Sequence, residues 1–155
     1  MSARQLQRLF EIDAYAFGVN VKGLSHEDSL VQPPAGGNCL NWVAAHIVAS
    51  RNTILELLGE APVWDAERVD RFKRGSRPVT DTQGSLPFDT IVADFRRSQE
   101  RIQAGLARLD DGGLLEKRGE DTLADKLHFL QFHEAYHIGQ AGLLRRMAGK
   151  ECAIP

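Results

Sequence analysis

Cysteine is scarce in this 155-residue sequence, which contains only Cys39 and Cys152 and no Cys-x-x-Cys pair. Two isolated thiols are typical of a reducing compartment and provide no disulfide framework. The sequence also lacks an apolar run of the roughly 20 residues that cross a bilayer, and its first residues lack the apolar segment of a signal peptide. We therefore expect a cytoplasmic protein that has no membrane partner.

An excess of charge of either sign is missing as well. The 19 Lys and Arg residues nearly balance the 21 Asp and Glu residues, and the formal net charge is −2. Nonspecific binding to nucleic acid depends on a basic surface field, so we expect no nucleic-acid partner. The length suits a single domain with one apolar core, spanning residues 1–155.

Alternating apolar and polar residues, the pattern of a half-buried strand, do not occur over any useful length, and no internal repeat is visible. Apolar residues instead recur with a helical period in four stretches. The first and third stretches cover residues 4–24 and 88–109. The second follows Asn38, an expected N-cap, and ends at residue 58, while the fourth runs from the capping residue Thr122 to Met147. The sequence therefore predicts an all-α protein.

Residues 59–87 do not fit this helical pattern. They contain Pro62, Pro78 and Pro87, several glycines and a charged run, with little apolar periodicity. We expect a long crossover that carries a short surface helix. A connection of this length allows the second and third helices to run parallel, and it is long enough to cover one end of the protein as a lid.

Two histidines in the last stretch, His133 and His137, are four residues apart. On a helix this spacing separates them by about 40° and about 6 Å, so both rings can bind one metal ion. His46 lies in the second helical stretch and could supply a third ligand. A single buried histidine is more often an ordinary core residue, but the pair on one apolar face favours a metal. His128 should face outward and His26 should lie in a loop, so we assign neither a ligand role.

The inward face of the last helix is expected to include His137 at its centre and His133 at its margin. Its other members are apolar or small, namely Leu123, Leu127, Leu130, Ala141 and Leu144. Gly139 and Gly142 lower the helix propensity of this segment, which indicates that a neighbouring helix approaches closely there.

Glu134 lies between the paired histidines and completes a His-Glu-x-x-His motif, in which the glutamate of a zinc peptidase acts as general base. The extended form of that motif is not present, because Gln140 and Leu143 occupy its glycine and third histidine positions. The Glu-x-x-His spacing also occurs in di-iron bundles, but those need a second copy, and none is present. Two interpretations of Glu134 are open: a catalytic or ligand-orienting carboxylate, and a solvated or interhelical salt-bridging residue.

Gln140 and Gln99 are candidates for hydrogen bonds that orient the metal ligands, and Asp13 is a further candidate. For both glutamines the alternative is an ordinary hydrogen bond between helices.

Three segments together resemble the DinB and YfiT-like family of metalloenzymes. They are Pro33-Pro34-Ala35-Gly36-Gly37-Asn38 leading into Asn41-Trp42-Val43-Ala44-Ala45-His46, the arginine-rich Phe95-Arg96-Arg97-Ser98-Gln99, and the ending His133-Glu134-Ala135-Tyr136-His137-Ile138-Gly139-Gln140. The resemblance covers almost the whole chain in order and spacing. Its most specific part is the Gly-Gln pair soon after the second helical histidine.

The resemblance implies a four-helix bundle of up-down-down-up topology. It also implies that His46, His133 and His137 bind a divalent ion, zinc or nickel, and that the chain forms a homodimer. Members with known chemistry include thiol-dependent S-transferases and isomerases, so a low-molecular-weight thiol is an expected small-molecule partner.

Three neutral imidazoles leave a divalent ion with open positions and its full charge, so the ion can activate either water or a thiol. The first functional hypothesis is therefore a metal-dependent thiol S-transferase or hydrolase. The alternative is a non-catalytic metal-binding stress-response bundle. Five cations of the crossover could contact an acidic substrate, or simply face water, as charge runs usually do. They are Arg68, Arg71, Lys73, Arg74 and Arg77.

Overall fold

The computed structural model describes residues 2–154, apart from the side chain of Asp111, and these residues are mostly helical. Four long helices are α1 (Ala3–Val21), α3 (Leu40–Leu57), α5 (Phe88–Ala107) and α7 (Leu123–Met147). Three short helices are α2 (His26–Ser29), α4 (Ala66–Phe72) and α6 (Asp111–Leu114), and a small hairpin pairs β1 (Lys117–Arg118) with β2 (Asp121–Thr122). The all-α prediction is confirmed.

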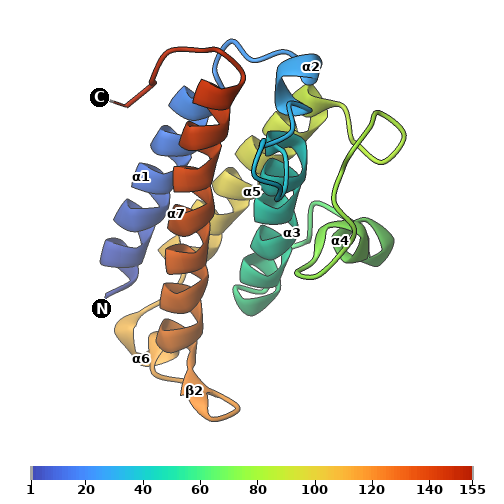
Figure 1. Cartoon of the computed structure of the whole chain (residues 1–155). Helices are drawn as coiled ribbons and strands as arrows, with labels where there is room; N and C mark the ends of the chain where they lie inside the picture. The colour runs from blue at the N-terminus through green and yellow to red at the C-terminus, as the bar shows by residue number, and fades with distance from the viewer. Residues whose placement is uncertain (1, 155) are drawn as a thin grey trace.

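The long helices lie side by side (Figure 1). Helix α7 packs against α1 and α3, and α5 packs against the same two helices. In Figure 1, α1 and α7 run in one direction while α3 and α5 run in the other. The apolar core lies between them in two clusters, one around Phe17, Val48 and Phe95 and one around Phe10, Leu55 and Leu127.

The predicted N-cap of α7, Thr122, is the residue that caps the helix in the structure. The Thr122 hydroxyl accepts a hydrogen bond from the backbone N–H of Asp125, whose carboxylate accepts one from the N–H of Thr122. The predicted N-cap of α3 is wrong by one residue, because Cys39 and not Asn38 caps that helix. Cys39 makes no side-chain cap bond and is instead buried, with its thiol 3.4 Å from the carbonyl oxygen of Val79.

The crossover contains the expected short helix, α4, and it also contributes side chains to the core. Trp64, Phe72 and Val79 are buried. Asn52 of α3 fastens the start of the crossover: its amide nitrogen donates to the carbonyl oxygen of Trp64 at 2.7 Å, and its oxygen accepts from the N–H of Val63 at 3.0 Å. The segment is therefore packed along α3, as Figure 1 shows.

The inward face of α7 differs from the prediction. Leu123, Leu127, Ala141 and Leu144 are buried as expected, but Leu130 and His137 are only half-buried. Their expected places are taken by Gln131, Glu134 and Ile138. The apolar periodicity was misleading here because two polar residues of this face find partners inside the protein and are buried with them.

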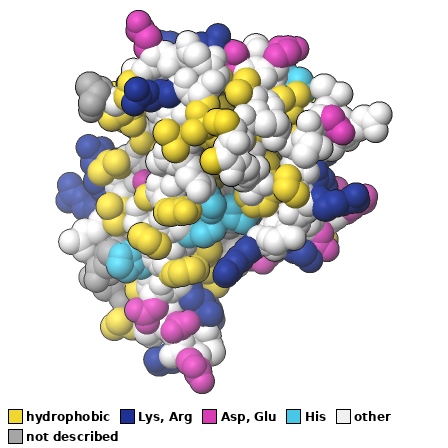
Figure 2. All heavy atoms as spheres, in the orientation of Figure 1, with side chains coloured by type: hydrophobic (Ala, Val, Ile, Leu, Met, Phe, Trp, Pro, Cys, Tyr) yellow, Lys and Arg dark blue, Asp and Glu magenta, His cyan; other side chains and the backbone are white. Residues whose placement is uncertain are grey.

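The outward face of α7 carries exposed apolar side chains, namely Phe129, Phe132, Tyr136, Leu143 and Met147. Figure 2 shows apolar side chains spread over one face of the molecule. A stripe of this kind is typical of a surface that contacts another protein, and the homodimer expected from the resemblance stays a prediction. None of the helices in the described part of the chain combines the length and hydropathy required of a membrane span.

Close helix contact explains one of the two glycines singled out in α7. A Cβ atom at Gly142 would lie 3.2 Å from the side-chain oxygen of Asn20 in α1, so the neighbouring helix is indeed close there. At Gly139 the expectation is wrong, because a Cβ atom would meet nothing within 4 Å. The tightest approach is instead at Gly105 of α5, where a Cβ atom would lie 2.9 Å from Cβ of Leu58.

We predict that Gly105→Ala destabilises the protein by about 1–3 kcal/mol, because the added methyl group overlaps a side chain that follows α3 directly. Gly18→Ala is the control: this glycine is also inside a helix, but its added methyl group has free space. It should stabilise the protein by about 0.5–1 kcal/mol through helix propensity alone. Urea unfolding measures both changes, and a Gly105→Ala variant as stable as the control would contradict the close contact.

Candidate metal site

Three histidine rings converge where α3 faces α7. His46 comes from the first half of α3, and His133 and His137 lie on either side of the middle of α7. Nε2 of His133 lies 3.2 Å from Nε2 of His46 and 3.1 Å from Nε2 of His137. One nitrogen atom from each ring lies within 4.8 Å of the other two. The structure thus brings together the three residues that the sequence suggested as ligands.

Two of the rings are held by hydrogen bonds through their other nitrogen atom. Nδ1 of His46 lies 2.7 Å from the backbone oxygen of Phe72, and Nδ1 of His137 lies 2.7 Å from the side-chain oxygen of Gln140. Both oxygens can only accept, so both Nδ1 atoms carry the proton and both Nε2 atoms present a lone pair. Gln140, a candidate for a hydrogen bond to a ligand ring, thus contacts His137, whereas no pattern in the sequence indicated the contact from Phe72.

Burial keeps the three imidazoles neutral. The pKa of His133 falls from 6.5 to about 4, chiefly through burial and then through its neighbours His137, His46 and Arg74. Burial also lowers the pKa of His46 and of His137, although the hydrogen bonds to Phe72 and Gln140 oppose the change. A metal ion binds only the neutral ring, so these shifts favour ligation at neutral pH.

The donor set fits a divalent cation. The Nε2 atoms of His46 and His137 direct their lone pairs toward Nε2 of His133 at distances of 3.2 and 3.1 Å. This arrangement is repulsive unless a proton or a cation lies between the nitrogen atoms. Nitrogen ligands at about 2.0–2.1 Å from a tetrahedral ion lie about 3.3 Å apart, close to these separations. Nδ1 of His133 is buried and has no hydrogen-bond partner among the described residues, so this ring lacks the support that the other two have.

The histidine cluster is reached from the surface. All three rings line a cavity of about 710 Å³ together with Trp42, Arg74 and Tyr136, and His46 and His133 also line a smaller one of about 220 Å³. Figure 2 shows histidine side chains as a patch on this face, with apolar groups on one side and a basic group next to them. A small molecule can therefore approach the convergent nitrogen atoms from solvent.

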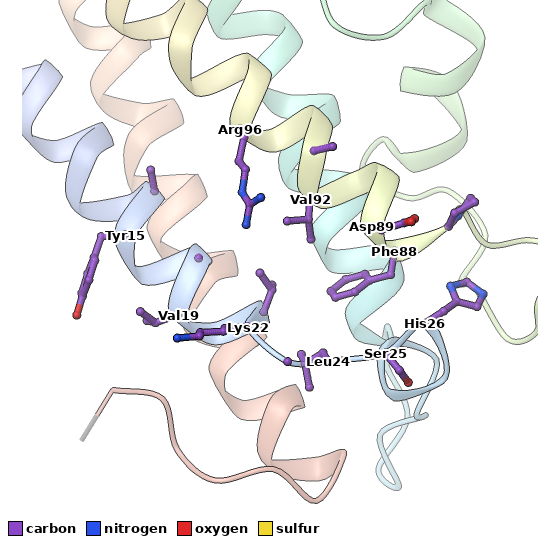
Figure 3. A pocket seen from close by; sticks show the side chains of 16 residues that line it. Tyr15, Val19, Lys22, Leu24, Ser25, His26, Phe88, Asp89, Val92 and Arg96 are labelled. Carbon is purple, nitrogen blue, oxygen red and sulfur yellow. The ribbon is translucent and has the colours of Figure 1, made fainter.

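A larger cavity, of about 940 Å³, lies elsewhere, between α1 and α5 (Figure 3). Its lining includes Arg96 and Lys22 but none of the three histidines, so we place the chemistry in the smaller, histidine-lined cavity. His26 borders this larger space and begins α2, contrary to the loop position expected for it, whereas His128 is exposed as expected.

Glu134 forms an ion pair inside the protein. Its two oxygens accept hydrogen bonds from Nη2 and Nε of Arg51 at 2.6 and 2.8 Å, and the two side chains are 2% and 0% exposed. Of the two interpretations open for Glu134, this arrangement matches the interhelical salt bridge. Gln99 also contacts Arg51, at 3.0 Å, and makes no hydrogen bond to the histidines. Arg51 was not expected in the interior, because a charged residue in an apolar helix usually faces solvent.

We predict that Arg51→Met lowers the free energy of unfolding by about 3–5 kcal/mol, because it leaves the Glu134 carboxylate buried without its partner. Glu134→Leu alone should lower the free energy of unfolding by a similar amount, because it leaves the Arg51 charge buried without its partner. The loss of unfolding free energy in the double variant should be much smaller than the sum of the two single losses, since the double variant removes both charges. Urea unfolding of the four proteins measures the coupling, and additive losses would show that the pair is not the source of the effect.

Asp13 lies close to this ion pair and is almost completely buried. Its Oδ2 accepts a hydrogen bond from Gln131 at 3.1 Å. Burial, followed by the negative charge of Glu134, raises the pKa of Asp13 from 3.8 to about 7, although Gln131 and Arg51 oppose the rise. Asp13 does not contact the histidines through any hydrogen bond, so its suggested role beside the metal ligands is replaced by one in the buried network.

The raised pKa makes the stability of the protein depend on pH. The folded protein keeps a proton on Asp13 that the unfolded chain releases, so this stabilising contribution is complete below pH 3.8 and is lost as the pH rises through about 7. We predict that Asp13→Asn, which carries no charge, becomes more stable relative to the wild type by more than about 1 kcal/mol between pH 5 and pH 8. The difference between the two proteins in urea isolates Asp13 from the histidines, and a constant difference would contradict the shift.

The five crossover cations have different surroundings. Arg68 lies over the ring of Trp64, and Lys73 pairs with Asp70. Arg71 donates to the backbone oxygens of Arg77 and Gly84, both at 2.8 Å. Arg74 lines both histidine cavities, whereas Arg77 lines neither.

Comparison with known proteins agrees with this geometry. The sequence model of the DinB superfamily matches residues 17–141, a span that includes all three histidines and most of the chain. The protein therefore belongs to the DinB superfamily. No curated protein matches the chain.

Proposed function

We propose that this protein is a divalent-metal-dependent enzyme that acts on a small thiol, with His46, His133 and His137 as the metal ligands. Zinc or nickel is the proposed ion. The observation that supports this most directly is the convergence of three Nε2 atoms at the wall of a surface cavity. We also propose that the four long helices form a four-helix bundle of up-down-down-up topology, which agrees with their packing and directions.

An ion held by three neutral imidazoles would supply a Lewis acid that lowers the pKa of a coordinating thiol or water. The cavity supports an enzyme rather than a non-catalytic metal-binding bundle, because the convergent nitrogen atoms are open to small molecules on one side. The residues of the chain position the ligands: Phe72 and Gln140 hold two of the rings in the tautomer that a metal requires.

The surroundings of Glu134 favour thiol transfer over hydrolysis. A hydrolase of the His-Glu-x-x-His type uses this glutamate as a general base, but here both carboxylate oxygens accept bonds from Arg51. Among the described residues that line the two histidine cavities, none is an aspartate or glutamate. Thiol transfer needs no such base, because a thiol of lowered pKa releases its proton to water, the sulfur–carbon bond forms and the leaving group departs.

We predict that the wild type, expressed with zinc or nickel supplied, binds about one equivalent of metal. Alanine at His46, His133 or His137 should abolish that stoichiometric binding. The matched control is His128→Ala, which removes an exposed histidine from the same helix and should leave the metal content unchanged. Elemental analysis of the five purified proteins measures this. A wild type without metal, or ligand variants that retain it, would refute the site.

The same proteins test the reaction class. A thiol and a fluorogenic alkyl bromide should react faster with the metal-loaded wild type and the His128→Ala variant than with the His133→Ala variant. A loaded wild type with no effect on thiol alkylation would instead support a non-catalytic role for the ion.

A further inference from the structure

Arg74 differs from the other cations near the histidines in having no partner. It makes no hydrogen bond or ion pair with any described residue, whereas Lys73 and Arg71 beside it are both engaged. It nevertheless lines both cavities onto which the histidine cluster opens.

The backbone around Arg74 is fixed to the helix that carries His46. Two residues before it, the carbonyl oxygen of Phe72 accepts the hydrogen bond from His46. Two residues after it, the hydroxyl of Ser76 accepts a bond of 3.1 Å from the indole nitrogen of Trp42. The Trp42 ring itself stacks on His46, with centroids 4.8 Å apart. Arg74 is therefore held between two anchors, both of which contact the site.

An unpaired guanidinium at such a position has a specific chemical preference. It offers planar, paired N–H donors that match a carboxylate, and no described carboxylate of the chain lines these cavities to occupy them. Arg74 is exposed, so its guanidinium is accessible to a solute that enters the cavity from solvent.

We propose that Arg74 selects the substrate of this site by binding a carboxylate on the thiol. This inference rests on the proposed function, because it assumes that the thiol sulfur approaches the histidine cluster. The substrate class is then a small thiol that carries a carboxylate. Arg74 is a positioning residue, since it binds the substrate away from the reacting atom.

The test compares two probes with the same number of carbon atoms, 3-mercaptopropionate, which ends in a carboxylate, and 3-mercaptopropan-1-ol, which ends in an uncharged hydroxyl. Their binding to zinc-loaded protein is measured by calorimetry, after the zinc content of each protein has been determined. The wild type should bind the acid about tenfold more tightly than the alcohol, and Arg74→Gln should remove most of this preference. Arg74→Lys should retain part of it, because the charge remains but the paired donors are lost.

Arg77→Gln is the matched control, since it removes the same charge from the same loop at a residue outside both cavities. It should leave the preference for the acid unchanged. The role of Arg74 would be overturned if the wild type bound both thiols equally, or if the Arg74→Gln and Arg77→Gln variants lost the preference for the acid to the same extent. Either result would leave the proposed thiol site intact. Zinc-loaded protein that binds neither thiol would overturn the proposed function together with this inference.

Discussion

The ion pair between Arg51 and Glu134 connects the two helices that form the site. Both charges are removed from water, so neither helix can slide or rotate without leaving a buried charge unpaired. Arg51 follows His46 by five residues, about 7.5 Å along the helix, and Glu134 is adjacent to His133. The pair therefore fixes the relative position of α3 and α7 close to the point where their histidines must meet. Two helices held only by apolar contacts would have no comparable restriction on their register.

Further polar residues complete this interior. Arg51 also donates to the backbone oxygen of Phe95 and to the Ser98 hydroxyl, and its guanidinium lies 3.6 Å from the centre of the Phe95 ring. The nearby carboxyl of Asp13 is almost as buried as Glu134, and its raised pKa means that it is protonated over most of the acidic range. Among Arg51, Glu134 and Asp13, one positive and one negative charge then remain, which limits the cost of burying a second acid beside the ion pair.

The sequence was sufficient to predict the four long helices and the convergence of His133 with His137, because both follow from spacing along a helix. That His46 joins this pair was expected from the family resemblance and not from spacing. Thr122 and the four-residue separation of His133 and His137 are local signals. Which face of α7 points inward was not predictable from spacing. Glu134 is buried because it pairs with Arg51, and Gln131 because it pairs with Asp13, and both partners lie more than 80 residues away in the sequence. The same limit applies to Phe72: its contribution is a backbone oxygen, which any residue at that position would present. Asn38 was misassigned as a cap because the sequence does not show that the adjacent cysteine is buried.

The crossover both holds the His46 ring and lines the two histidine cavities. Its carbonyl at Phe72 sets the tautomer of His46, while its buried side chains attach it along α3. A change that loosens this segment would therefore disturb the His46 ring before it disturbed His137, whose partner Gln140 belongs to the same helix as the ring itself. His133, without a partner of its own, depends on its neighbours for its orientation. The two histidines of α7 thus keep their spacing through helix geometry. His46 is aligned with them by the crossover, which also lines the two histidine cavities.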